Sequence, residues 1–136
     1  MPLLSRIPGP AAALLCIWAL PVQAGDLNLT RSVKPGLPSP LGYERSWDGN
    51  CQDTGAIVTV TSQPGHGTVS IAQKVSLIPA STPRYGSTGR CAGRSIKGKQ
   101  VLYRSQPGFH GRDHLSWHVA YGNGKSGDVD MTVIVP

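Results

Sequence analysis

Apolar and polar residues alternate along most of the second half of the chain. In segment 114–121 every second residue is apolar, namely Leu115, Trp117, Val119 and Tyr121. Segment 128–135 repeats this pattern with Val129, Met131, Val133 and Val135. An apolar residue at every second position is the period of a strand that buries one face. Both segments are therefore predicted to be β-strands with these residues in the core.

Shorter alternating runs precede these two strands. Segment 56–62 alternates valine with threonine, and segments 68–72 and 99–104 each place two apolar residues on one face. Turns rich in glycine, at 63–67 and 122–127, separate the runs. No amphipathic helix longer than a turn or two fits the pattern after residue 24. We therefore expect an all-β fold, an immunoglobulin-like antiparallel β-sandwich of about seven strands.

The pattern also suggests how the chain is divided. Residues 25–50 are polar and contain three prolines, so we expect a lead-in segment with at most one edge strand, ending near Trp47. Residues 51–136 are expected to form the sandwich domain. Within it, the glycine-rich stretch 81–98 is predicted to be a long loop or an irregular hairpin.

The first 24 residues have the features of a secretory signal peptide. Arg6 precedes an apolar run at 11–20, and small residues end the segment at Ala24. The run is shorter than the roughly 20 residues that a membrane-spanning helix needs, and Pro21 interrupts it. We expect cleavage after Ala24, a periplasmic or secreted location, and no stable membrane insertion.

Cysteine usage fits an exported protein. Cys16 lies in the predicted signal, which leaves Cys51 and Cys91. Two cysteines in an oxidising compartment favour a disulfide over a catalytic thiol. The bridge closes a loop of about 40 residues, which is worth roughly 3–4 kcal/mol by chain entropy.

Positive charge gathers in one segment. The whole chain carries a net charge of +6, and between positions 84 and 104 there are six basic residues and no acidic one. A local basic field favours an anionic partner, such as an acidic glycan or an acidic protein surface, although a solvated basic loop has the same composition. The six candidate ligand-binding residues are Arg84, Arg90, Arg94, Lys97, Lys99 and Arg104.

Two motifs resemble those of immunoglobulin-like and cadherin-like modules of bacterial surface and adhesin proteins. The first is the P-x-x-G-x-V turn and strand that starts at Pro64 and includes Gly67. The second is Y-x-P-x-x-G-F-x-G-x-D-x-F-x-Y, which is represented here from Tyr103 through Trp117. The resemblance covers roughly residues 55–136 and implies a binding or structural module. Such modules usually occur in tandem, whereas this chain contains one copy.

The second motif has a physical interpretation of its own. Phe109 is expected to close one end of the core, and Gly111 lets the backbone reverse. Asp113 is expected to cap this corner by accepting backbone N–H groups, as aspartate does in turns. That structural role is preferred to calcium binding, because the nearby acidic residues do not form a calcium loop.

Histidines offer an alternative function. His66 and His110 are predicted to lie in corner turns and, with Asp113 or His114, are candidate ligands of copper or zinc. His114 and His118 share a face of one strand but are about 13 Å apart along it, too far to share one ion. A periplasmic metal-binding protein is therefore the second hypothesis, and ordinary surface histidines are the competing interpretation.

Catalytic patterns are sparse. The chain has no G-x-S-x-G motif, and Glu44 is its only glutamate, so neither a serine hydrolase nor a glycosidase with a glutamate pair is indicated. We expect a non-enzymatic binding or structural module without a cofactor. Its expected partner is an envelope protein or an anionic glycan. Nucleic acid is not expected, because the aromatic residues near the basic segment are predicted to be core residues in an exported chain.

Overall fold

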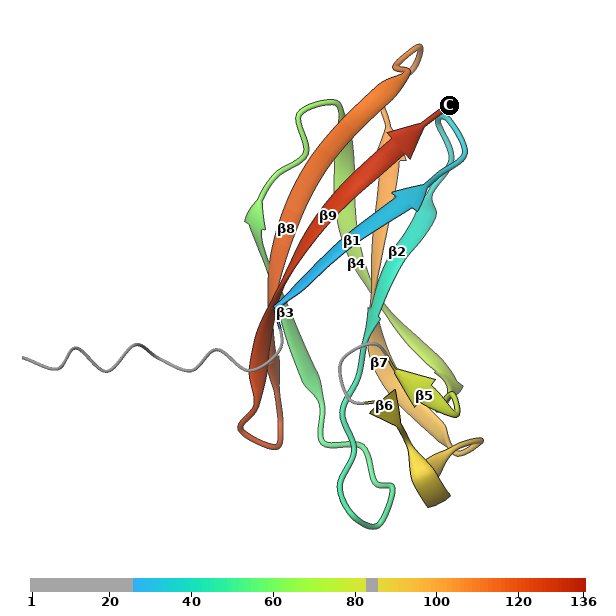
Figure 1. Ribbon diagram of the computed structural model, residues 1–136, viewed down its shortest axis with the longest axis vertical. Coiled ribbons are helices and arrows are strands. Elements are labelled where there is room, and N and C mark those ends of the chain that lie inside the picture. Colours follow the sequence, from blue (N-terminus) through green and yellow to red (C-terminus); the bar gives the residue numbers. More distant parts are fainter. Residues whose placement is uncertain (1–25, 83–85) are drawn as a thin grey trace, which may run out of the picture.

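Two packed β-sheets form the body of the molecule in the computed structural model, which describes residues 26–82 and 86–136 (Figure 1). The predicted signal peptide 1–24 and the candidate ligand-binding residue Arg84 lie outside these residues. The strands are β1 (Leu27–Ser32), β2 (Ser39–Glu44), β3 (Ala56–Ser62), β4 (Gly67–Leu77), β5 (Ser81–Thr82), β6 (Gly86–Ser87), β7 (Ser95–Ser105), β8 (Gly111–Tyr121) and β9 (Ser126–Val135). A 3₁₀ turn, η1 (Gly89–Cys91), precedes β7.

The strands are arranged in two main sheets and one small one. The first sheet has the order β1-β9-β8-β3, the second has the order β2-β7-β4, and β5 pairs with β6. All pairs are antiparallel except β1 with β9, which run parallel. The predicted all-β sandwich is confirmed. The main sheets together contain the expected seven strands, and β5 and β6 add two strands of two residues each.

The segment expected to be a lead-in is part of both sheets. β1 pairs with β9 from Leu27↔Val129 to Ser32↔Ile134, and β2 pairs with β7. The sequence pattern did not show β2 because Gly42 and Glu44, and not apolar side chains, occupy two of its positions that face the core. At Gly42 a β-carbon would come within 2.8 Å of the Trp117 ring, so the indole fills the place of a side chain there. Residues 25–50 thus contain two strands, where we expected at most one.

The main core follows the alternation of the sequence. The inward-facing apolar residues of β8 and β9 are buried, and Trp117, Leu115 and Met131 are at most 1% exposed. Val101 and Tyr103 of β7 and Leu41 of β2 cover them from the second sheet. Burial of this one continuous cluster is the main source of stability in such a fold.

The second sheet separates from the first toward one end of the molecule (Figure 1). β4 and β7 pair along eleven residues each, from Gly67↔Ser105 to Leu77↔Ser95. In Figure 1 their far halves diverge from β3 and β8 toward β5 and β6. The stretch 81–98 is therefore only partly the loop we expected, because β7 already begins at Ser95.

Candidate binding surface

Asp113 organises the turn at one end of the sandwich. Its carboxylate accepts hydrogen bonds from the backbone N–H groups of Gly65 and His66, each at 2.9 Å. The hydroxyl of Tyr103 donates a third bond at 2.7 Å. These contacts join the turn between β3 and β4 to the start of β8, so Asp113 performs the capping role assigned to it from the motif. We call residues 63–67 and 106–113 the corner end.

The contacts between Asp113 and Tyr103 shift the pKa values of both groups. Burial by itself would raise the pKa of Asp113, but the hydrogen bonds from Tyr103, Gly65, His114 and His66 lower it below its ordinary value. Burial, reinforced by the hydrogen bond to Asp113, raises the pKa of the Tyr103 hydroxyl above its ordinary value. Asp113 is therefore a charged structural group with its oxygens occupied.

The other motif residues also build the corner end. At Gly67 a β-carbon would lie 2.6 Å from the Tyr103 ring and 2.5 Å from the Arg104 carbonyl oxygen, so no other residue fits without a shift. Phe109 packs against the main core and stacks on the His66 ring, with centroids 4.3 Å apart. Gly111 has a φ of 131°, which favours glycine. Pro64 lies in the turn that Asp113 caps.

The histidines proposed as metal ligands have separate partners. His66 stacks on Phe109, His110 Nδ1 lies 2.6 Å from the Pro136 carbonyl oxygen, and His114 Nε2 lies 3.9 Å from Asp130. Within residues 26–82 and 86–136, no three or more His, Cys, Asp or Glu side chains form a group suited to a metal ion. The structure therefore does not bring His66, His110 and His114 together as a site.

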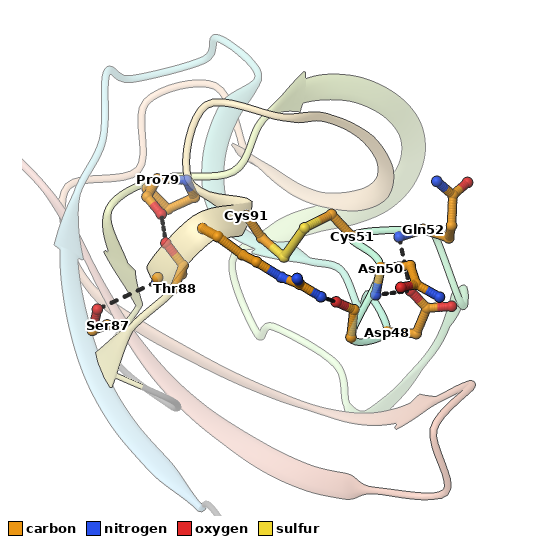
Figure 2. The surroundings of a disulfide bond; sticks show 11 residues. Asp48, Asn50, Cys51, Gln52, Pro79, Ser87, Thr88 and Cys91 are labelled. Atoms are coloured by element: carbon orange, nitrogen blue, oxygen red, sulfur yellow. Dashed lines mark hydrogen bonds between the residues drawn. A yellow bond between two sulfur atoms is a disulfide. The ribbon is translucent and has the colours of Figure 1, made fainter.

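The opposite end of the sandwich is held by the predicted disulfide, which is confirmed. Cys51 and Cys91 are bonded, with their Cα atoms 5.3 Å apart (Figure 2). The bridge ties the loop 46–53 to η1, and Arg90 of η1 donates to the Gly49 carbonyl oxygen of the same loop. We call residues 46–53, 78–82 and 86–96 the disulfide end.

Hydrogen bonds shape the three segments of the disulfide end. The Asp48 carboxylate accepts from the backbone N–H groups of Asn50 and Gln52, at 2.9 and 3.0 Å. Thr88 donates its hydroxyl to the Pro79 carbonyl oxygen (Figure 2). A small apolar cluster lies beneath them, made of Cys51, Ile78, Cys91 and Ile96 with Trp47 packed against it. Local hydrogen bonds and the bridge thus replace a large core here.

Glu44 is a buried carboxylate that the sequence pattern did not single out. It is 7% exposed, and its two oxygens accept from Trp117 Nε1 at 2.9 Å and from the Tyr121 hydroxyl at 2.6 Å. It lines a cleft of about 220 Å³ between β1 and β2 that also includes Leu29 and Trp47. Because both oxygens have donors, Glu44 supports the packing of two core aromatics.

The basic residues do not form a single patch. Arg104 pairs with Thr68 near the corner end, whereas Lys97 pairs with Val75 and Lys99 with Gln73 far along the same strands. Lys97 and Lys99 line one groove of about 380 Å³. Lys97 lines a second groove, of about 480 Å³, together with Arg94 and Val75. Arg94, Lys97 and Lys99 are therefore grouped, and Asp53 is the acidic residue that lines both grooves.

Exposed apolar residues lie next to these three basic residues. Ile71, Val75 and Leu77 of β4 are 38%, 57% and 65% exposed. Their positions differ by even numbers, so they share the face of β4 that is partly buried at Val69 and becomes uncovered toward the disulfide end. Sequence reasoning placed Val69 and Ile71 on one face but did not extend the strand to residue 77. We call Ile71, Val75, Leu77, Arg94, Lys97 and Lys99 the β4–β7 surface.

Comparison of the chain with protein-family models, curated protein sequences and solved structures found no match. The β-sandwich is therefore established by the structure, and the resemblance to immunoglobulin-like and cadherin-like modules depends on the motifs quoted above. Within the residues that the structure describes, no helix is both long and apolar enough to span a membrane.

Proposed function

We propose that this protein is an exported, non-enzymatic binding module of the immunoglobulin-like or cadherin-like type. It recognises a partner protein or an anionic envelope ligand through the β4–β7 surface. The observation that carries this proposal is the grouping of Arg94, Lys97 and Lys99 around two adjoining grooves, one of which is also lined by the exposed Val75. A basic group beside exposed apolar side chains combines electrostatic attraction with area to bury.

Two further features support the proposal. The Cys51–Cys91 disulfide suits an oxidising compartment and agrees with the signal-like N-terminus. The buried carboxylates of Glu44 and Asp113 are both occupied by donors from the core and the corner end. They therefore act in the framework, which leaves recognition to the surface.

A charge-reversal experiment tests the surface directly. The triple variant Arg94→Glu, Lys97→Glu and Lys99→Glu is compared with a control, Arg31→Glu, Arg104→Glu and Arg112→Glu, that has the same net charge. Both are applied with the wild type to immobilised heparin and to immobilised poly-glutamate in a salt gradient. Because charge attraction is local and screened, we expect the first variant to lose retention and the control to keep most of it. Equal losses in the two variants would show that net charge alone acts and would overturn the assignment.

A further inference from the structure

β4 is a long strand at the edge of its sheet. It spans eleven residues and has β7 as its only strand neighbour among the residues that the structure describes. It contains neither proline nor an acidic residue, and Lys74 is its single charge. Edge strands usually carry charges, prolines or bulges that prevent pairing with another strand. β4 has little of this protection.

The register shows which backbone groups β4 presents outward. Gln106 N donates to His66 O at 2.9 Å and Ile78 N donates to Arg94 O at 2.8 Å, at the two ends of the β4–β7 ladder. In an antiparallel ladder such hydrogen-bonded pairs recur at every second residue. The even-numbered residues of β4 therefore bond to β7. The odd-numbered residues, including Ile71, Gln73 and Val75, direct their N–H and C=O groups away from it.

The side chains of the same odd-numbered residues lie on the uncovered face. Ile71, Val75 and Leu77 are exposed there, while Ile78 and Ile96 belong to the apolar cluster of the disulfide end. On β7, Lys97 and Lys99 are the neighbours of Val75 and Gln73. One edge thus offers free backbone groups, an apolar stripe and positive charge together.

We propose that β4 accepts an extended segment of a partner protein as an additional strand, and that this segment alternates apolar and acidic residues. The inference deepens the proposed function and rests on it. Apolar residues of the segment pack on Ile71, Val75 and Leu77, while its acidic residues lie on the opposite face of the sheet, beside Lys74. Lys97 and Lys99 lie on the face of the apolar stripe and contribute only longer-range attraction. Backbone hydrogen bonds supply affinity and the side chains supply specificity, as in other cases of strand addition.

Charge decides between this occupant and a second copy of the chain. A second copy would bring its own Lys74 to the shared edge, with the like charges of Lys97 and Lys99 one strand behind it, whereas an acidic segment brings charge of the opposite sign. Like charges close together in neighbouring strands are destabilising, and opposite charges stabilise. The acidic segment of another protein is therefore the occupant that fits.

Amide hydrogen exchange measured by NMR tests the pairing residue by residue. The oxidised protein is mixed with a capped eight-residue peptide of alternating valine and glutamate, and separately with its valine–lysine counterpart. We expect the first peptide to slow exchange at the amides of Ile71, Gln73 and Val75 by at least about tenfold, because they gain hydrogen bonds. The even-numbered amides of β4 are already bonded to β7 and should change little. The lysine peptide should have no effect.

A matched pair of variants separates strand addition from simple charge attraction. Val75→Lys places a charge on the apolar stripe, and Leu37→Lys adds the same charge at a 55% exposed residue in the turn between β1 and β2. Both add positive charge, so attraction alone would not weaken binding of the glutamate peptide. We expect Val75→Lys to weaken it about tenfold and Leu37→Lys to leave it unchanged.

The outcomes distinguish the two proposals. If the glutamate peptide binds through Arg94, Lys97 and Lys99 but the odd-numbered amides keep their exchange rates, strand addition is wrong and the proposed function stands. If the peptide does not bind and the charge-reversal variant also behaves like its control, both fail. If the odd-numbered amides slow with protein concentration alone, the occupant is a second copy, and the acidic segment is overturned.

Discussion

The corner end and the disulfide end of this sandwich are stabilised by different means. At the corner end, Asp113 and Tyr103 link the turns directly to a core of fully buried side chains. At the disulfide end the apolar cluster is small, and the Cys51–Cys91 bridge holds the loop 46–53 against η1. Where β4 and β7 separate from the first sheet, a covalent link and local hydrogen bonds take the place of a large buried core.

The difference has a functional consequence. Because the bridge holds one face of the β4–β7 extension, the other face stays uncovered without loss of the strands themselves. Val75 and Leu77 remain more than half exposed on that face. A region that need not bury its apolar residues to stay folded is free to use them in recognition. The contrast assigns stability to the corner end and the main core, and it supports the proposal that the β4–β7 surface is used for binding.

The largest effect should come from the main core. Trp117→Ala removes a side chain that is 1% exposed and leaves Glu44 Oε1 without its indole donor. We expect a loss of about 3–5 kcal/mol in the free energy of unfolding, measured by chemical denaturation. Ile57→Ala, at a 69% exposed residue, is the control and should change it by less than about 0.5 kcal/mol. Similar losses in the two variants would contradict the assignment of the core.

The disulfide should come next. Replacing Cys51 and Cys91 together by alanine removes a link across a sequence separation of 40, which should cost about 3–4 kcal/mol by chain entropy. Because the bridge also holds the loop 46–53 against η1, its removal should allow the disulfide end to open locally, and hydrogen exchange should accelerate more at Ile78 and Ile96 than at Leu115. Uniform acceleration across all three amides would show that the disulfide end is not a separate stabilised region.

A smaller, pH-dependent effect is expected at the corner end. Asp113→Asn should cost about 1–3 kcal/mol near neutral pH, because a carboxylate with several donors loses its charge. The folded pKa of Asp113 lies below its unfolded value of about 4. Its contribution is therefore present above the unfolded pKa and disappears as the pH falls through the folded pKa.

Denaturation of the wild type and the Asn variant from pH 7 to pH 2 measures this dependence. The stability difference should shrink steadily below about pH 4. Tyr103→Phe, which removes one donor to Asp113 and keeps the buried ring, should show the same trend with a smaller amplitude. A difference that is constant with pH would mean that Asp113 is not charged in the folded protein.

Much of the fold was predictable because its core follows a local pattern. Inward-facing apolar residues occupy every second position of β8 from Leu115 and of β9 from Val129. Trp117 and Met131 could therefore be placed in the core from sequence alone. The cysteine pair was predictable from its number and expected compartment. These signals depend on nearest neighbours along the chain and on residue type.

The missed features depend on long-range contacts. β1 pairs with β9 across about a hundred residues, and burial of Glu44 is compensated by Trp117 and Tyr121 from another strand. Neither has a local signature. For the proposed binding surface, the sequence showed that the segment 84–104 is basic. It did not show that Lys97 and Arg104 lie far apart, because that depends on the path of β7. The exposure of Val75 depends on where the first sheet ends.

A map of backbone amide shifts, recorded as the valine–glutamate peptide is titrated into the oxidised protein, tests recognition through the β4–β7 surface most directly. If the β4–β7 surface binds the peptide, the largest changes lie in β4 from Ile71 to Leu77 and at Arg94, Lys97 and Lys99. Changes centred instead on the corner end, or on the cleft between β1 and β2, would contradict the assignment of recognition to the β4–β7 surface.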